Sequence, residues 1–407
     1  MLQTNPKLWC WLKRFFVLLI FMQHSQAICC RFNVRDVGFV DLGSKPYNLY
    51  IFIGNDMPNN MRDSLQSICV ATFYDTNIKF DLISLSEASK TSVKDFIPPN
   101  FKGEFPVAVL VSPDHSPNKE TFNITLHKDG EPLTKTAWDA LESLVDSPRR
   151  NAILEKVFDC YGVIMIVEGE NADENNQIRT IAEKVASETA ATLPGLEKEI
   201  KTPPVVEVIT TDQFEKEKAF LWSLNIFKKP PTSQVVILYG RGRKIGPVLE
   251  GNTLNEAAIA AILSTIGLNC ECGLDRKWMQ GAMVPLKWDK DRKQKIAKQL
   301  GFNPESPEIR IEMSQILAKG SAGQGAHRSK IIGDTLDELL TGYRSGELSV
   351  GNTIKTKETT DTNENSKDIS KANNSGISLT GWIVISIISI LLIGGSIPLV
   401  ARRKNIP

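Results

Sequence analysis

The residues of this sequence best suited to chemistry are its cysteines. Cys29 and Cys30 are adjacent, and Cys270 and Cys272 are separated by one residue. In an oxidising compartment these pairs would form disulfides that join the amino-terminal arm to the end of the second half of the chain. Four thiolates also suit zinc, although zinc ligands usually have at least two residues between them. Redox exchange by Cys270 and Cys272 is the third interpretation, because closely spaced disulfides are strained and easily reduced.

Charged and aromatic residues supply the candidates for binding. Arg35 and Asp36 are adjacent within the segment NVRDVGFVDLG, where neighbouring opposite charges are more often solvated surface than a binding site. Arg241 and Arg243 lie in a glycine-rich turn that suits a phosphate, but a phosphate loop leads from a strand into a helix, whereas this turn joins two strands. We therefore expect a hairpin turn there. Trp278 is the last candidate, either in an interaction patch or as core filler.

No familiar catalytic constellation accompanies these residues. The four histidines have no second ligand at metal spacing, and the sequence lacks a nucleophile elbow, a P-loop and a zinc-protease motif. Cys69 and Cys160 lie in apolar segments, which is typical of core thiols. We therefore predict no catalytic residue and no cofactor, and leave open which metal, if any, is bound. A formal net charge of +1 disfavours a nucleic-acid partner, because such proteins carry a basic stripe.

Both ends of the 407-residue chain carry targeting signals. Residues 1–27 have the pattern of a signal peptide, with an apolar run after Arg14 and small residues before a cleavage site at Ala27; an uncleaved anchor is the alternative. Trp382–Ala401 is long and apolar enough to span a membrane, and Arg402–Lys404 follows it. Residues 376–407 are therefore predicted to form a transmembrane helix with a short cytoplasmic tail. The bulk of the chain is then extracytoplasmic and tethered to the cell membrane.

The elements between these ends repeat one pattern. In residues 28–146, strands at 47–53 and 78–85 enclose a helix at 57–71, and strands at 105–111 and 122–126 precede a helix at 134–145. In residues 147–273 a connecting helix ends near 158. Strands at 162–168 and 205–209 then enclose a helix at 174–192, a helix at 214–224 follows, and strands at 235–239 and 245–249 precede a helix that ends at 267. The predicted fold class is α/β, with a βαβ unit followed by a ββα unit in each of two tandem copies.

Three local expectations are open to a direct structural check. The alternation of Phe32 and Val34 predicts an edge strand or an extended arm at the start of the first copy. Arg149 and Arg150 open the connecting helix and are expected to be solvated, because positive charge there opposes the helix dipole. Met61 is expected to be buried by the first helix, together with other apolar residues at helical spacing.

Two segments connect the second copy to the membrane. Residues 274–345 predict a helical extension, with helices at 289–300, 307–317 and 334–340. Residues 346–375 consist mostly of Thr, Asn, Ser, Lys and Glu with almost no apolar residues, which predicts a flexible linker.

The predicted order of elements resembles the thioredoxin-like fold over most of residues 45–270. Redox-active members of that family carry a Cys-x-x-Cys motif at the start of the first helix. This sequence has Asn55–Pro58 at that position in the first copy and Gly169–Ala172 in the second. Without an attacking thiolate the usual thiol exchange is not expected at either place. The resemblance therefore implies a binding scaffold.

A second resemblance concerns three segments, NVRDVGFVDLG at 33–43, YGRGRKIGPVLEG at 239–251 and CECGLDR at 270–276. Together they are similar to a group of uncharacterised, membrane-anchored exported bacterial proteins, here with tandem thioredoxin-like domains that lack the Cys-x-x-Cys motif. We expect a membrane-tethered scaffold or accessory protein that binds another envelope or membrane protein without catalysis. The alternative is a thiol-disulfide or metal-handling protein that uses Cys270 and Cys272, so enzymatic activity stays an open question.

Overall fold

The computed structural model describes residues 31–99, 101, 106–113, 121–196, 198–268 and 280–322, with side chains as far as residue 317. Several predictions fall outside these residues: the signal peptide at 1–27, the helix at 334–340, the linker at 346–375, the membrane-spanning segment at 376–407, and the four paired cysteines and Trp278. Within the described ranges no helix is both long and apolar enough to cross a membrane.

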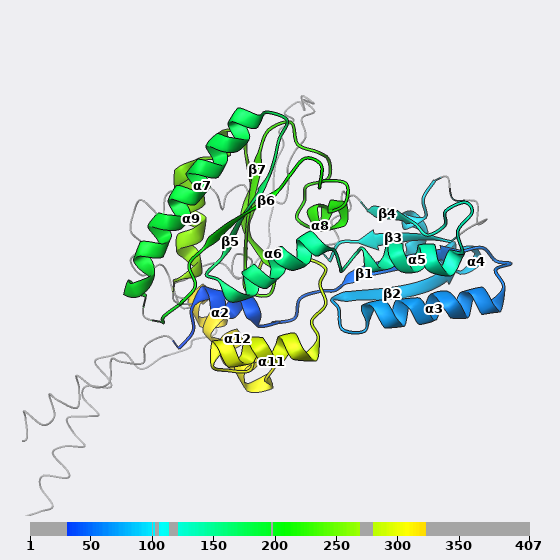
Figure 1. The fold of residues 1–407 in the computed structure, drawn as a ribbon. Helices are drawn as coiled ribbons and strands as arrows, with labels where there is room; N and C mark the ends of the chain where they lie inside the picture. Colours follow the sequence, from blue (N-terminus) through cyan, green and yellow to red (C-terminus); the bar gives the residue numbers. More distant parts are fainter. Residues whose placement is uncertain are drawn as a thin grey trace, which may run out of the picture. The chain divides into compact units, whose positions relative to one another are not determined.

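The first half of the chain forms a four-stranded mixed sheet (Figure 1). Its strands are β1 (Tyr47–Ile53), β2 (Ile78–Ser84), β3 (Val107–Val111) and β4 (Phe122–Thr125), in the order β2-β1-β3-β4. β1 pairs with β2 in parallel and with β3 antiparallel, and β3 and β4 are antiparallel. The helices are α3 (Asn59–Phe73), α4 (Leu85–Ala88), η2 (Ser92–Phe96) and α5 (Leu133–Glu142). The predicted βαβ unit followed by a ββα unit is confirmed here.

The second half repeats this topology. The strands β5 (Val163–Val167), β6 (Val205–Ile209), β7 (Gln234–Tyr239) and β8 (Arg243–Glu250) form a sheet of order β6-β5-β7-β8 with the same pairing directions. Its helices are α6 (Pro148–Asp159), α7 (Ala172–Thr192), η3 (Leu193–Gly195), α8 (Lys218–Ser223), η4 (Gly251–Thr253) and α9 (Glu256–Ile266). The chain is thus a mixed α/β protein with two four-stranded sheets.

Short sequence signals explain why the elements begin and end where they do. β5 reads VIMIV and is buried at every position, as expected for a central strand covered on both faces. The side chain of Ser147 accepts a hydrogen bond from the backbone of Arg150, and Pro148 occupies the first helical position of α6. α9 is capped in the same way by Asn255 and ends at Gly267.

The amino-terminal arm is a helix, so the expectation of a strand or extended arm is wrong. α2 (Val34–Phe39) begins with a capping box in which Asn33 and Asp36 each bind the other's backbone. All six residues of α2 are buried, so neither a helical nor a strand period distinguishes a solvated face. The signal that was missed is the cap, an Asn followed three residues later by an Asp.

The region after α9 packs against both halves. It contains α11 (Lys290–Leu300) and α12 (Pro307–Ala322). On the side of the first half, Asn77 accepts a hydrogen bond from the backbone of Leu286 and donates one to the carbonyl of Val284. On the side of the second half, the backbone nitrogen of Val284 donates to the carbonyl of Gly242 at 3.0 Å. Residues 281–288 therefore connect the two sheets through hydrogen bonds.

The turn between β7 and β8 touches α2 so closely that only glycine fits. Gly240 has φ of +56°, and a Cβ atom there would lie 2.5 Å from the backbone of Gly38. The expected hairpin turn is confirmed, and the requirement for glycine is both conformational and steric.

Replacing Gly240 with alanine tests this packing. The left-handed backbone costs an alanine about 1–2 kcal/mol, and the clash with α2 adds about 1–3 kcal/mol. Gly130→Ala is the matched control, because its φ is +79° but nothing lies within 4 Å of the added Cβ. Urea unfolding should show the larger loss of stability for Gly240→Ala. Equal losses for the two variants would contradict the close packing of the turn on α2.

Candidate functional site

The paired cysteines that head the list of sequence candidates lie outside the described residues. Described residues close to them in the sequence are nevertheless in contact, because the backbone nitrogen of Val34 donates a hydrogen bond to the carbonyl of Leu268 at 2.8 Å. Val34 is four residues after Cys30, and Leu268 is two residues before Cys270. The two segments that carry the cysteines therefore start from neighbouring points.

Arg35 and Asp36 are buried, so the expectation of solvated surface is wrong. Arg35 donates from Nε to the carbonyl of Cys160 at 2.9 Å and from Nη2 to the carbonyl of Phe158 at 3.0 Å, at the carboxyl end of α6. Burial lowers the pKa of Arg35, and the helix-end carbonyls are suitable partners for its positive charge. Asp36 pairs with Lys198 at 2.6 Å. These residues attach α2 to the second half.

Arg241 and Arg243 are also engaged inside the protein. Arg243 donates from Nε to the carbonyl of Gly38, from Nη1 to the carbonyl of Gly281 and from Nη2 to the hydroxyl of Ser44, at 2.9 to 3.0 Å. Arg241 pairs with Glu305 at 2.9 Å, and its guanidinium lies 4.1 Å from the ring centre of Trp288. Burial lowers the pKa of Arg241 to about 10. The turn thus binds protein groups.

The two arginines at the start of α6 have internal partners as well. Arg150 is fully buried and donates to the carbonyls of Leu144 and Ser143, so its expected solvation is wrong. Arg149 is half-buried and pairs with the buried carboxylate of Glu207 at 2.9 Å. Sequence reasoning missed both roles because the acceptors are backbone carbonyls and a carboxylate on a distant strand.

The two helix starts at which redox-active thioredoxin-like proteins carry their thiols hold no cysteine in this chain. α3 begins after Pro58 and α7 after Asn171, and neither helix start contains a cysteine. In the second half, the loop before α7 is held by Asn175. Its side-chain oxygen accepts a hydrogen bond from the backbone nitrogen of Gly169 at 2.9 Å, and its side-chain nitrogen donates one to the carbonyl of Gly169 at 3.1 Å. A Cβ atom at Gly169 would lie 2.5 Å from the backbone of Thr232. The backbones of Gly169 and Thr232 are therefore in close contact beside the start of α7.

Cys69 and Cys160 are free and buried, which confirms them as core thiols. Burial raises the pKa of Cys69 to about 12 and that of Cys160 to about 11. A thiol attacks as its thiolate, so neither group is an effective nucleophile at neutral pH. Across the described ranges, no group of three or more His, Cys, Asp or Glu side chains is placed to hold a metal ion.

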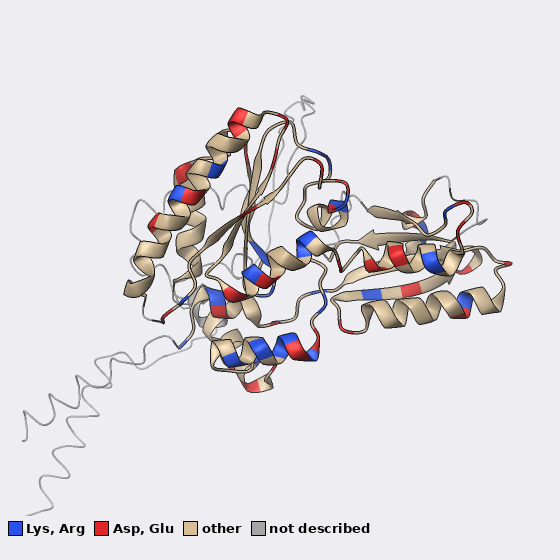
Figure 2. Cartoon of the chain, viewed as in Figure 1, with Lys and Arg blue, Asp and Glu red and all other residues tan. Residues whose placement is uncertain are grey.

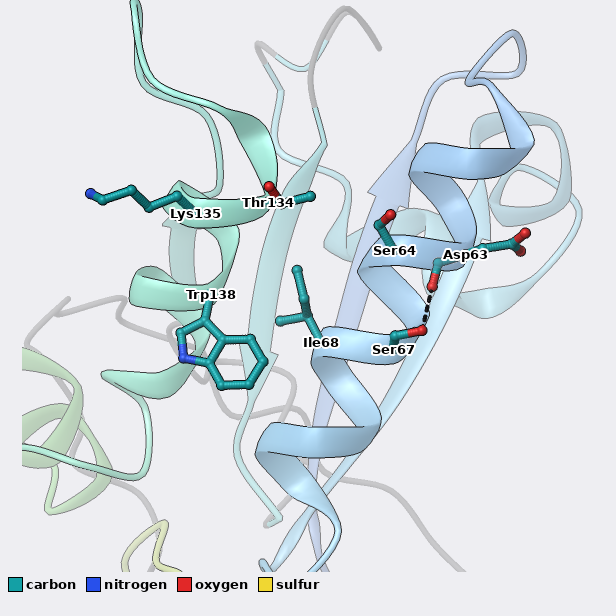
Figure 3. Close-up of a pocket in the computed structure, with 7 residues that line it drawn as sticks. All are labelled: Asp63, Ser64, Ser67, Ile68, Thr134, Lys135 and Trp138. Atoms are coloured by element: carbon teal, nitrogen blue, oxygen red, sulfur yellow. Dashed lines mark hydrogen bonds between the residues drawn. The ribbon is translucent and has the colours of Figure 1, made fainter.

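An open groove lies between α3 and α5 of the first half (Figure 3). Its volume is about 570 Å³, and it is lined by Asp63, Ser64, Ser67 and Ile68 from α3 and by Thr134, Lys135 and Trp138 from α5. Ile68 points into the groove from one side and Trp138 from the other. The indole nitrogen of Trp138 donates to Glu142 at 3.0 Å, which fixes the ring in place.

Most of the exposed large apolar side chains belong to the two helices that form this groove, although only Trp138 lines it. Six large apolar residues are exposed among the described residues, and four of them belong to α3, its carboxyl cap or α5: Met61 at 38%, Val70 at 47%, Tyr74 at 82% and Trp138 at 40% exposure. The expected burial of Met61 is therefore wrong. Clustered exposed apolar groups are typical of an interaction surface, whereas isolated ones are not.

The charges of this surface are unevenly arranged. α3 carries only Arg62 and Asp63 along its fifteen residues, whereas acidic and basic positions lie side by side on α5 (Figure 2). Lys135 bonds Glu131 at 2.9 Å and Asp139 at 3.2 Å. The hydrogen bonds from Lys128 and Lys135 lower the pKa of Glu131 to about 2, so this carboxylate stays ionised. Asp63 is the groove carboxylate that has no ion pair with any described residue.

Sequence reasoning did not find the groove. Its two walls are about seventy residues apart in the chain, and each helix alone resembles an ordinary core helix. The available signals were Val70 and Tyr74, apolar residues on the stripe of α3 that also carries Asp63.

Comparisons with known proteins identify structural neighbours only. No family model matches the chain, and no curated protein matches it. The first two thioredoxin domains of Saccharomyces cerevisiae Eps1p are 9% identical, with 54% of this chain and 92% of that chain covered and a TM-score of 0.20. Those of Naumovozyma dairenensis Eps1p are 10% identical, with coverage of 56% and 94% and a TM-score of 0.18. Human ERp44 form I is 9% identical, with coverage of 57% and 54% and a TM-score of 0.18. These neighbours are thioredoxin-domain proteins, and such low similarity indicates nothing about activity.

The buried thiols give a direct chemical test. In the folded full-length protein at about pH 8, we expect iodoacetamide to leave Cys69 and Cys160 unmodified, because their thiolate populations are negligible and reagent has no access. Both should be modified after unfolding in guanidinium, as read by mass spectrometry of the peptides that contain them. Rapid modification of either one in the folded protein would show that a reactive thiol had been overlooked.

Proposed function

We propose that this chain is a membrane-tethered, extracytoplasmic scaffold or accessory protein that binds another envelope protein without catalysis. The observation that carries the proposal is the groove between α3 and α5, which Trp138 lines, together with the exposed Val70 of α3 and Tyr74 at its carboxyl cap. A groove of this kind, with fixed aromatic and apolar groups beside a few polar ones, suits a protein partner.

The chemistry of the described cysteines supports a binding role. Thiol exchange needs an accessible thiolate at a helix start, and α3 and α7 begin without one. In the second half, Asn175 and Thr232 contact Gly169 in the loop before α7. We propose that the chain has two tandem thioredoxin-like modules and a membrane tether at 376–407. With this tether, the groove would lie on the extracytoplasmic side, where a neighbouring membrane protein can bind it.

Substitutions in the groove test the binding role. We expect Trp138→Ala combined with Tyr74→Ala to reduce recovery of a stoichiometric envelope protein from native membranes by at least about tenfold. Loss of one buried aromatic anchor typically costs about 2 kcal/mol or more. Phe227→Ala is the control, because Phe227 is exposed to a similar degree, at 41%, but lies in the second half. The double variant should retain its circular dichroism spectrum and melting temperature.

The result would count against the proposal in two cases. One is that no protein co-purifies in mild detergent from membranes that contain the full chain. The other is that a partner co-purifies equally well with the double variant and with Phe227→Ala, which would place the binding surface elsewhere.

A second candidate function is thiol-disulfide or metal handling by Cys270 and Cys272. The observation that bears on it is the hydrogen bond from Val34 to Leu268. An extended chain spans about 3.3–3.6 Å per residue, so Cys30 is within about 14 Å of Val34 and Cys270 within about 7 Å of Leu268. These upper limits are compatible with disulfides between the two cysteine pairs and equally with a redox pair at Cys270 and Cys272.

Disulfide mapping separates these alternatives. Under non-reducing conditions, we expect peptides containing Cys29 and Cys30 to be joined to the peptide containing Cys270 and Cys272, with no free thiol at these four positions. Reduction should then lower the melting temperature, since a disulfide closing so long a loop contributes about 2–5 kcal/mol. A Cys270–Cys272 bond that exchanges with glutathione, or stoichiometric zinc, would instead support the second candidate.

A further inference from the structure

We propose that the outer edge of β2 binds an extended segment of a partner protein, which adds to the first sheet as a further antiparallel strand. The segment carries apolar residues at alternate positions, with a basic residue opposite Asp81 and an acidic residue opposite Lys79. This surface is distinct from the α3–α5 groove, since none of the residues that line the groove belongs to β2. The inference therefore goes beyond the proposed function and does not depend on it.

The backbone of β2 has groups that are free to pair with another strand. β2 is an outer strand of its sheet, which has the order β2-β1-β3-β4 (Figure 1). In its parallel pairing, alternate residues direct their backbone groups towards β1, beginning with the carbonyl of Asn77, which accepts from Tyr47 at 3.0 Å. Phe80 and Leu82 are intervening residues, so their amides and carbonyls point away from the sheet, where no described residue bonds them.

The chain itself already uses the start of this edge for antiparallel pairing. Thr76 and Lys287 form an antiparallel bridge, and the backbone nitrogen of Trp288 donates to the carbonyl of Asp75 at 2.6 Å. This segment arrives from the β7–β8 turn, to which Val284 is bonded, so it covers only the residues before β2. The edge therefore accepts an antiparallel neighbour, and β2 itself stays open among the described residues.

The second sheet shows how edge strands are protected in this protein. At β6, which has the place of β2 in the sheet order, Arg149 of α6 donates from Nε and Nη2 to the carbonyl of Val208. At β8, the backbone nitrogen of Lys244 donates to the carbonyl of Ala282 at 2.9 Å. Such cover matters because an open edge pairs with other chains. The seven-residue β2 has no comparable cover within the described part of the chain.

One face of β2 favours apolar side chains on the partner. Phe80 and Leu82 are half-buried against the core cluster that includes residues of α3. The rings of Phe73 and Phe80 are 6.2 Å apart, and Val70, three residues before Phe73, lies on the same side of α3 and is 47% exposed. An added strand would therefore place alternate apolar side chains beside Phe80, Leu82 and Val70.

The other face of β2 adds a charge pattern. Lys79 and Asp81 are exposed, and neither forms an ion pair with a described residue. Residues directly opposite each other in antiparallel strands have close side chains, so opposite charges stabilise the pair and like charges destabilise it. Read from its amino end, an antiparallel partner therefore needs a basic residue opposite Asp81 and then an acidic residue opposite Lys79, with an apolar residue between them.

Two hexapeptides of identical composition test the inference on the full-length chain in zwitterionic nanodiscs. Thr-Val-Lys-Val-Glu-Val has the expected order of charges, and Thr-Val-Glu-Val-Lys-Val has the reverse order. Fluorescence anisotropy of the labelled peptides should show about three- to tenfold tighter binding of the first, as expected for two cross-strand ion pairs. Lys79→Glu combined with Asp81→Lys should reverse this preference. Glu199→Lys combined with Lys201→Glu reverses two exposed charges of the second half and should leave the preference unchanged.

N-methylated forms of the first peptide test the backbone pairing separately. In the proposed register, the amides of its first two valines lie opposite Leu82 and Phe80 and donate to β2, whereas the amides of its lysine and glutamate face away. Methylation of those two valine amides should weaken binding at least about tenfold, because two hydrogen bonds are lost. Methylation of the lysine and glutamate amides should leave the affinity within about twofold.

Other results would contradict the inference. If neither peptide binds, or if both methylated forms bind like the unmodified peptide, β2 is not a strand-addition site. If the double reversal at Lys79 and Asp81 leaves the preference unchanged, the peptides bind elsewhere. If the second peptide binds the unaltered chain more tightly, the partner strand runs parallel and the assigned orientation is wrong. If sedimentation shows self-association that the first peptide suppresses, the occupant is a second copy of this chain.

Discussion

The buried guanidinium of Arg243 holds together three segments that lie far apart in the chain. Its three nitrogens donate hydrogen bonds to Gly38 of α2, Ser44 before β1 and Gly281 after α9. A buried charge is tolerated only when it is fully hydrogen-bonded, so the arginine stabilises the structure only while all three acceptors are in place. One side chain therefore links α2, the β7–β8 turn and the segment that begins at Gly281.

The strands and most helices could be predicted from the sequence because their signals are local. Val163–Val167 is an uninterrupted apolar run, and Ser147 followed by Pro148 marks a helix start. The same order of elements occurs in both halves, so each half predicts the topology of the other. The amino-terminal helix was missed because all its residues are buried, so hydrophobic alternation carried no information about its period.

The roles of the arginines could not be predicted for a different reason. Arg35, Arg150 and Arg243 bind mainly backbone carbonyls. Every residue has a backbone carbonyl, so the residue types in the sequence do not show which carbonyl accepts the bond. The groove was equally hidden, because it exists only where α3 and α5 lie beside each other. The two halves share a topology, but the exposed apolar residues Met61, Val70, Tyr74 and Trp138 all belong to the first half, and this difference is the basis of the proposed binding surface.

The contact between α2 and the end of the second half also constrains the order of events during synthesis. α2 leaves the ribosome early, but Arg243 follows Gly38 by 205 residues and Leu268 follows Val34 by still more. At about 5–20 residues per second, α2 waits roughly 10–40 s for its partners. During that interval the apolar residues of α2 have no native site, so they stay exposed to non-native contacts until the second sheet is complete.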